Sequence, residues 1–358
     1  MTLHSTDISL DGVVWNSLSD LDIFRQTLLY RTFSQSPFGF VDVGSLDGVH
    51  PVIYPVAGIS QVSCFEPFES GYQALQKQYE NHSFADLKIH PVALGNERRE
   101  GVDFYVTQKA NCSSLLKPGR EILKRYGAQN SEVVATEKIK LQTLDSIFLG
   151  QKLACDFIKL DTQGSEYDIF CGAQKTLSEQ VVAIWCEVEF FQVYENQKVF
   201  ADVDMFLRQQ GFSLYGLYPN YRSKKLLDRK NHDFEERLMW ADAVYFKDPL
   251  GTLTLPKPLT ERQRLSLILT AILTRYFDFA LELTNEYITD TRDRQQIVDF
   301  IKTISRVNSQ DWAQKIQQLH QNVTSQRNQA YILSRQFIDR NYSNASADYI
   351  NLSPSSLS

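Results

Sequence analysis

The 358-residue chain lacks the features that mark disulfide frameworks, zinc sites and membrane spans. Its five cysteines contain no Cys-x-x-Cys pair, so the pattern predicts reduced thiols without a bound zinc ion. No apolar run is long enough to span a bilayer, and the opening residues, MTLHSTDISLDG, lack the basic flank and apolar stretch of a signal peptide. These absences predict a cytoplasmic protein without a membrane span.

An excess of positive charge is also missing. The formal net charge is −6, from 37 Lys and Arg against 43 Asp and Glu. Proteins that bind nucleic acid or an anionic bilayer through their overall charge carry an excess of basic residues. The composition therefore predicts neither partner, and no group of His and acidic residues has the spacing of a metal site. The 43% of hydrophobic residues is still sufficient for a sizeable core.

Short apolar runs alternate with longer amphipathic runs over residues 39–250. This alternation is typical of strand–helix units around a mostly parallel sheet, so we expect an α/β domain there. Residues 1–38 predict a helical segment packed on that domain. Residues 251–340 predict a C-terminal helical region, which opens with the capping-box spacing of Thr260 and Gln263. The last segment, 341–358, is rich in Ser and Asn and is expected to be disordered.

The first strong strand ends in a turn that contains glycine, in FVDVGSLDGVHPV at residues 40–52. Gly44 and Gly48 permit backbone N–H groups to approach a ligand closely, although a tight connection without a ligand explains them equally well. The next strand, QVSCFEP, ends in Glu66, where nucleotide-binding α/β folds place an acid on the ribose hydroxyls. The alternative for Glu66 is capping of the following helix.

The same turn distinguishes between cofactors. A dinucleotide site needs the pattern G-x-G-x-x-G and a regular helix after it, but here the third glycine is missing and two prolines interrupt the helix. We therefore expect an irregular first helix and a cofactor without a pyrophosphate. S-Adenosylmethionine offers a ribose to Glu66 and an ammonium group to Asp42, so the sequence predicts this cofactor rather than NAD.

Seven segments follow one another along the chain: FVDVGSLDG, CFEPFESGYQAL, HPVALGN, NCSSLLKP, TLDSI, FIKLDTQGSEYDIFCGA and CEVEFFQVYENQKVFADVDMFLRQQGF. Over residues 40–247 their order and spacing resemble the FkbM family of S-adenosylmethionine-dependent methyltransferases. The resemblance implies the class I methyltransferase (Rossmann-like) fold, a mostly parallel seven-stranded sheet with helices on both faces and an antiparallel last strand. It also implies methyl transfer to a hydroxyl oxygen.

By position, the resemblance assigns these residues to the cofactor: Asp42, Gly44, Gly48, Glu66, Ala93 and Asp161. Asp161 is also placed where the methyl group meets the acceptor, whereas Ala93 belongs to the adenine wall. One motif departs from the family. Where its members commonly read Asp-x-Glu-Gly, this chain reads Asp161-Thr162-Gln163-Gly164, so no acid role is carried over to Gln163.

Methyl transfer to an alcohol needs an in-line geometry and a base for the hydroxyl proton. The candidate catalytic residues are Asp161, Glu187 and Glu189. The two glutamates alternate along one strand and therefore point to one face of the sheet. A structural cap on the next helix is the alternative for Asp161, and Glu166 and His50 are further candidates for the base.

Several functions agree with this pattern. The leading hypothesis is O-methylation of a hydroxyl on a glycan or glycolipid precursor, with a macrolide or another secondary metabolite as the second acceptor class. A non-catalytic cofactor-binding scaffold and an NAD-dependent oxidoreductase are alternatives of other kinds. The C-terminal helices are expected to form a lid, a homodimer surface or a partner-binding module, and the sequence does not choose among these.

Overall fold

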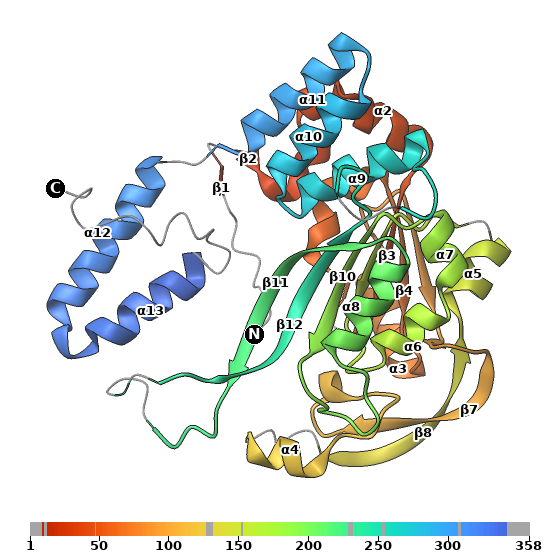
Figure 1. Cartoon of the computed structure of the whole chain (residues 1–358), viewed down its shortest axis with the longest axis vertical. Helices are drawn as coiled ribbons and strands as arrows, with labels where there is room; N and C mark the ends of the chain where they lie inside the picture. Colours follow the sequence, from red (N-terminus) through yellow and green to blue (C-terminus); the bar gives the residue numbers. More distant parts are fainter. Residues whose placement is uncertain are drawn as a thin grey trace.

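The computed structural model describes residues 9–10, 13–46, 48–126, 132–151, 153–227, 232, 234–251, 255–306 and 309–341. At its centre lies a seven-stranded sheet with the strand order β11-β12-β10-β9-β3-β4-β5 (Figure 1). The strands are β3 (Phe38–Val43), β4 (Ser60–Phe65), β5 (Asp86–His90), β9 (Phe157–Leu160), β10 (Ala183–Glu189), β11 (Ser213–Arg222) and β12 (Arg237–Phe246). β12 is antiparallel to both its neighbours and the other pairs are parallel. This arrangement confirms the predicted fold class.

Helices cover both faces of the sheet, because its central strands alternate apolar side chains between two cores. In β3, Phe40 belongs to the first core and Val41 to the second. The first core is completed by α1 (Asp22–Arg25), α2 (Leu28–Gln35), α3 (Glu69–Gln78), α9 (Glu261–Leu273), α10 (Phe277–Tyr287) and α11 (Thr291–Ile304). The second is completed by α5 (Leu144–Gln151), α6 (Glu166–Cys171), α7 (Gln174–Glu179) and α8 (Phe200–Gln209).

The helix after the first strand is irregular, as the prolines predict. Residues Pro51–Ile59 form the 3-10 segment η2, which is interrupted at Val56 by non-helical backbone angles of −125° and 25°. Pro55 lies inside the segment and cannot donate a backbone hydrogen bond. The chain therefore crosses from β3 to β4 without a regular α-helix on the first face. Another short 3-10 segment, η1 (Trp15–Asp20), precedes α1 on this side.

Helix α9 lies in the first core and is buried from Leu265 to Leu273. It begins at the predicted capping box, in which Thr260 Oγ1 accepts from the N–H of Gln263 at 3.2 Å and Gln263 Oε1 accepts from the N–H of Thr260 at 3.0 Å. Arg262 then donates to Asp156 Oδ2 at 2.8 Å, just before β9. The start of the C-terminal region thus shares a core with the sheet, while the four-part division of the chain stays a prediction.

Smaller elements surround this body. A three-stranded sheet contains β6 (Ala93–Leu94), β7 (Arg99–Thr107) and β8 (Val133–Gln142), and a two-stranded one contains β1 (Ser9–Leu10) and β2 (Val13–Val14). The short helices η3 (Ala110–Cys112) and α4 (Arg120–Arg125) lie between β7 and β8 in the chain. In Figure 1, α12 (Ser309–Ser325) and α13 (Ala330–Asn341), joined by η5 (Arg327–Gln329), pair with each other away from the sheet. All but the first residue of the predicted disordered tail lies outside the described residues.

We predict that Arg262→Ala destabilises the protein by about 2–3 kcal/mol, because it removes the cation that faces a buried carboxylate. Asp156 would keep only its bonds from the N–H of Gly39 at 2.7 Å and the hydroxyl of Ser266 at 2.6 Å. The control is Arg99→Ala, which breaks an exposed ion pair with Glu97 and is expected to cost less than about 1 kcal/mol. Urea denaturation measures the free energy of unfolding of both variants. Equal losses in the two variants would show that Arg262 does not stabilise the contact of α9 with Asp156.

Candidate active site

Charged side chains gather on the first face of the sheet, toward the carboxyl ends of the parallel strands. Asp42 on β3 is in register with Lys159 on β9, and Glu187 on β10 is in register with Asp242 on β12. Their neighbours along each strand, such as Val41 and Ile158, belong to the second core, so these charged residues point to the first face. Ligands of open α/β sheets bind at this edge.

Asp42 is 1% exposed and closes the turn that follows it. Its Oδ2 accepts from the backbone N–H of His50 at 2.6 Å. Its Oδ1 lies 3.7 Å from the Nζ of Lys159 and has no hydrogen-bond partner among the described residues. Burial raises the pKa of Asp42, and the charge of Lys159 opposes that rise. Asp42 therefore holds His50 against its own strand and keeps one acceptor oxygen without a hydrogen bond.

Both glycines of the turn are required by the backbone itself. Gly44 has a φ of +90°, and a Cβ at this position would collide with the carbonyl oxygen of Asp161. Gly48 has a φ of +104°, and its Cβ would lie 2.7 Å from the hydroxyl of Tyr79. The tight connection between elements thus accounts for both residues, and their contact with a cofactor stays a prediction.

Glu66 and Ala93 lie beyond the ends of β4 and β5. Glu66 is 4% exposed, and its Oε1 accepts from the N–H of Phe68, the residue before α3, at 3.0 Å. Burial raises its pKa, and this bond opposes the rise. This contact at the start of α3 is the capping role predicted as the alternative for Glu66, and it occupies one of the two carboxylate oxygens. Ala93 is buried in β6, next to Leu141 of β8, so it lies in the small sheet.

Gln163 connects the predicted catalytic residues. Its Nε2 donates to Asp161 Oδ1 at 2.8 Å and to Glu187 Oε1 at 3.0 Å, and its Oε1 accepts from the hydroxyl of Tyr194 at 2.9 Å. A φ of 60° at Gln163 places it in the left-handed region, which non-glycine residues rarely adopt. An ionised glutamate at this position would have no N–H group to donate to its two acidic neighbours. The amide of Gln163 therefore makes contacts that a glutamate could not make.

The three predicted catalytic carboxylates differ in accessibility. The side chain of Asp161 is 38% exposed, and its Oδ2 lies 3.7 Å from Lys159 Nζ. Glu187 is partly exposed. Glu189 is 4% exposed and is not one of the two acids to which Gln163 donates. Burial, together with nearby acids, raises the pKa of both glutamates well above the usual range. The structure thus joins Asp161 and Glu187 through the amide of Gln163, and Glu189 takes no part in this connection.

The other two candidates for the base are buried and already bonded. Glu166 Oε1 accepts from the N–H and the hydroxyl of Thr162 at 2.7 and 2.9 Å, and burial raises its pKa to about 7. His50 Nδ1 accepts from the N–H of Val52 at 3.3 Å. Burial, followed by the charge of Lys159, lowers the pKa of His50 to about 3, so this imidazole is neutral.

Sequence reasoning missed two charged residues of this site, Lys159 and Asp242. Burial lowers the pKa of Lys159, but Asp42 and Asp161 raise it more, so the ammonium stays charged. Burial, followed by the charge of Asp161, raises the pKa of Asp242 to about 6. Lys159 is the single charge of β9 (FIKL), and Asp242 is the single charge of the stretch WADAVYF in β12; that contrast is the signal that marks them.

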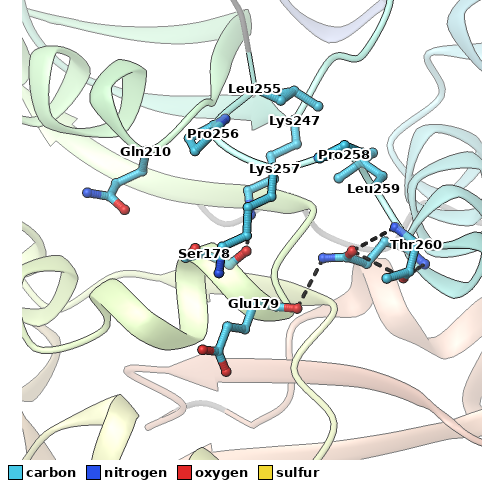
Figure 2. Close-up of a pocket in the computed structure, with 11 residues that line it drawn as sticks. Ser178, Glu179, Gln210, Lys247, Leu255, Pro256, Lys257, Pro258, Leu259 and Thr260 are labelled. Carbon is cyan, nitrogen blue, oxygen red and sulfur yellow. Dashed lines mark hydrogen bonds between the residues drawn. The ribbon is translucent and has the colours of Figure 1, made fainter.

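A cavity of about 190 Å³ lies at the opposite edge of the sheet, where β12 ends (Figure 2). It is lined by the ends of α7 and α8, by residues 255–260 and by Lys247. Lys247 donates to the carbonyl oxygens of Leu177 and Ser178, and burial, followed by the charge of Lys257, lowers its pKa to about 8. This lysine caps the end of α7, so the cavity is separate from the acidic site.

Within the described part of the chain, no three His, Cys, Asp or Glu side chains are arranged to hold a metal ion. In the same residues, no helix combines the length and apolarity needed to cross a membrane.

We predict that Gln163→Glu destabilises the protein more as the pH rises. The new carboxylate would face Asp161 and Glu187, so its pKa in the folded state would lie above the unfolded value of about 4.3. The destabilisation is then absent at low pH, where the new side chain is protonated in both the folded and the unfolded state. It reaches about 1–3 kcal/mol near pH 8. Urea denaturation at about pH 5 and about pH 8 measures the difference.

The matched control is Gln76→Glu on the exposed side of α3, where we expect a change below about 0.5 kcal/mol at either pH. If the two variants show the same pH dependence, Gln163 does not bridge the acidic residues in solution.

Residues 42–214 match the family model of the methyltransferase FkbM domain. Among solved structures, the methyltransferase FkbM from Methylobacillus flagellatus KT is 17% identical, with 59% of this chain and 43% of that chain covered and a TM-score of 0.34. This chain therefore matches less than half the length of that relative.

Two other matches in the solved structures are more distant in sequence. Sp1610 of Streptococcus pneumoniae, a putative tRNA (m1A22) methyltransferase, is 13% identical, with 76% of this chain and 95% of that one covered and a TM-score of 0.30. TrmK of M. capricolum, in complex with S-adenosyl-homocysteine, is 8% identical, with 76% and 93% covered and a TM-score of 0.30. No curated protein matches the sequence. The match over residues 42–214 identifies an FkbM methyltransferase domain in this chain, as the resemblance in the sequence implied.

Proposed function

We propose that the protein is a cytoplasmic S-adenosylmethionine-dependent methyltransferase that methylates a hydroxyl oxygen on a glycan or glycolipid precursor. The observation that carries this proposal is the pair Asp161 and Glu187, joined by the amide of Gln163 at the carboxyl edge of the sheet. Carboxylates and amides are the side chains that pair with alcohol donors and acceptors. A carboxylate that is partly exposed, as Asp161 is, can also receive a hydroxyl proton.

Two carboxylates at the ends of adjacent strands suit the cofactor. Asp42 keeps its buried Oδ1 without a hydrogen-bond partner among the described residues, and this oxygen would accept from the ammonium of S-adenosylmethionine. Glu66 follows the neighbouring strand β4 and would accept from the ribose hydroxyls. Gly44 and Gly48 lie in the connection between these strands and themselves adopt left-handed backbone angles. When bound, the cofactor supplies a methyl group on a positively charged sulfur.

The chain's own contribution is to position the acceptor and to take its proton. Asp161 lies 3.7 Å from the ammonium of Lys159 and is partly exposed, so its carboxylate would accept the hydroxyl proton. Burial, followed by the charge of Asp161, raises the pKa of Glu187, and this side chain would orient the acceptor through a hydrogen bond. Gln163 holds both groups at fixed positions, and this preorganisation lowers the entropic cost of bringing the reactants together.

The surplus of acidic groups supports an acceptor without phosphates. Burial, followed by the charges of Asp161, Glu189, Glu166 and Asp242, raises the pKa of Glu187, and Lys159 is the balancing cation beside Asp42 and Asp161. A nucleic-acid backbone brings one negative charge per nucleotide to such an edge and would be repelled. A macrolide or another secondary metabolite has the same hydroxyl chemistry as a glycan and is the second acceptor class in this proposal.

Glu66→Ala is expected to weaken binding of S-adenosylmethionine about tenfold or more, because hydrogen bonds to a charged group contribute about 1.5–3 kcal/mol each. Titration calorimetry of the full chain measures the affinity, with NAD as a ligand that should not bind. Glu69→Ala, in the exposed first turn of α3, is the control and should bind normally. Unchanged affinity in Glu66→Ala would reject the cofactor assignment.

Asp161→Asn is expected to lower methyl transfer about a hundredfold or more while cofactor affinity stays nearly normal. The assay supplies methyl-labelled cofactor and a panel of glycans, glycolipids and polyketides. Because Asn caps a helix as well as Asp does, near-normal turnover would assign Asp161 to capping and remove it from the mechanism. Cofactor binding without transfer to any acceptor would favour the scaffold alternative.

A further inference from the structure

The hairpin formed by β11 and β12 extends past the rest of the sheet. The ladder between β10 and β12 ends at Glu189 and Trp240, whereas β11 and β12 remain paired as far as Arg222 and Arg237. Three further residues of β12 correspond to about 10 Å of strand. Figure 1 shows the hairpin running out from the body at the edge where β10 ends. Residues at its tip are therefore held away from the core.

The tip exposes apolar side chains that have no partner in the core clusters. Leu226 is 82% exposed and Leu227 is 49% exposed, and Tyr221, five residues before Leu226, is 43% exposed. Single exposed leucines are common on protein surfaces, but two consecutive ones on a projecting hairpin form a small apolar patch. Such a patch is typical of a surface that inserts into a lipid interface or contacts another molecule.

Basic residues adjoin this patch on the same arm. Lys224 and Lys225 are exposed and directly precede the two leucines, and Arg222 follows Tyr221. Among the described residues of the returning arm, the acids are Glu235, which is exposed, and Glu236, which accepts from the hydroxyl of Ser223 at 2.7 Å. The segment from Tyr221 to Leu227, which we name the basic tip, therefore combines positive charge with exposed leucine.

The negative charge of the whole chain does not cancel this local positive charge. At physiological salt, charges are screened over about 8 Å, which is less than the roughly 10 Å by which the hairpin extends past β10. A surface that meets the tip first therefore interacts mainly with Lys224 and Lys225, because the guanidinium of Arg222 lies over the ring of Trp240 at 4.3 Å. Net charge alone predicts no contact with an anionic bilayer, and the local arrangement gives the opposite expectation.

We infer that the basic tip docks on a lipid bilayer that carries anionic headgroups. Lysines near such a surface are attracted to its headgroups, and leucines gain free energy by entering the interface. RNA would use the basic residues but not Leu226 and Leu227, and lysine is depleted in protein–protein interfaces. The same sheet edge carries Asp161 and Glu187, so docking would turn that edge toward molecules held in the bilayer. The docking itself does not require methyl transfer.

The experiment is co-sedimentation of the full-length protein with vesicles of phosphatidylcholine mixed with phosphatidylglycerol, and with vesicles of phosphatidylcholine alone. We expect binding to the anionic vesicles that weakens as salt is raised. Lys224→Glu with Lys225→Glu should weaken it about tenfold or more. Leu226→Ser with Leu227→Ser should weaken it by a similar or larger factor.

Matched controls lie elsewhere on the surface. Met205→Ser changes a 62% exposed apolar residue on α8, and Lys175→Glu with Lys257→Glu reverses two exposed charges away from the hairpin. Both controls should sediment like the unchanged protein, and circular dichroism checks that every variant is folded. Failure of the unchanged protein to bind anionic vesicles would overturn the inference. So would unchanged binding in both tip variants, or binding of transfer RNA that the lysine variant loses and the leucine variant keeps.

Discussion

A buried lysine between two aspartates organises the carboxyl edge of the sheet. Lys159 lies 3.7 Å from Asp42 on one side and 3.7 Å from Asp161 on the other, so one cation balances the turn after β3 and the turn after β9. Without it, Asp42 would be a buried carboxylate whose charge is balanced by no neighbour, and such groups cost several kcal/mol. These ion pairs join the end of β3, just before the turn that contains Gly44, to the end of β9.

The open edge also depends on what covers the other half of the same face. α9 packs over the amino-terminal half of the strands, with Phe40, Phe157 and Val244 beneath it in one core. Because these apolar side chains occupy that half, the polar residues of the same strands are confined to the far half. The sheet thus separates a hydrophobic half, which stabilises the fold, from a charged half, which is available for chemistry.

Much of the fold follows from local patterns, but the connections within the site do not. Buried strands such as β3 (FGFVDV) and β9 (FIKL) are short apolar runs with one charged residue each, and the Thr260 capping box has a fixed spacing, so both are recognisable in sequence. β8 (VVATEKIKLQ) escaped prediction because mostly exposed, charged side chains alternate along it and give no apolar run. Gln163 could be noticed only as a departure, since its contacts with Asp161 and Glu187 depend on a left-handed backbone and on a strand far along the chain.

The antiparallel direction of β12 has a consequence for how this protein can change. Since β12 begins at the carboxyl edge and ends at the opposite one, its first residues belong to the projecting hairpin while Ala243, Val244 and Tyr245 belong to the cores. The loop that joins β11 to β12 can therefore be lengthened, shortened or replaced without shifting the register of any core residue. The hairpin is an exchangeable module, through which one catalytic edge can be adapted to different surroundings at little cost in stability.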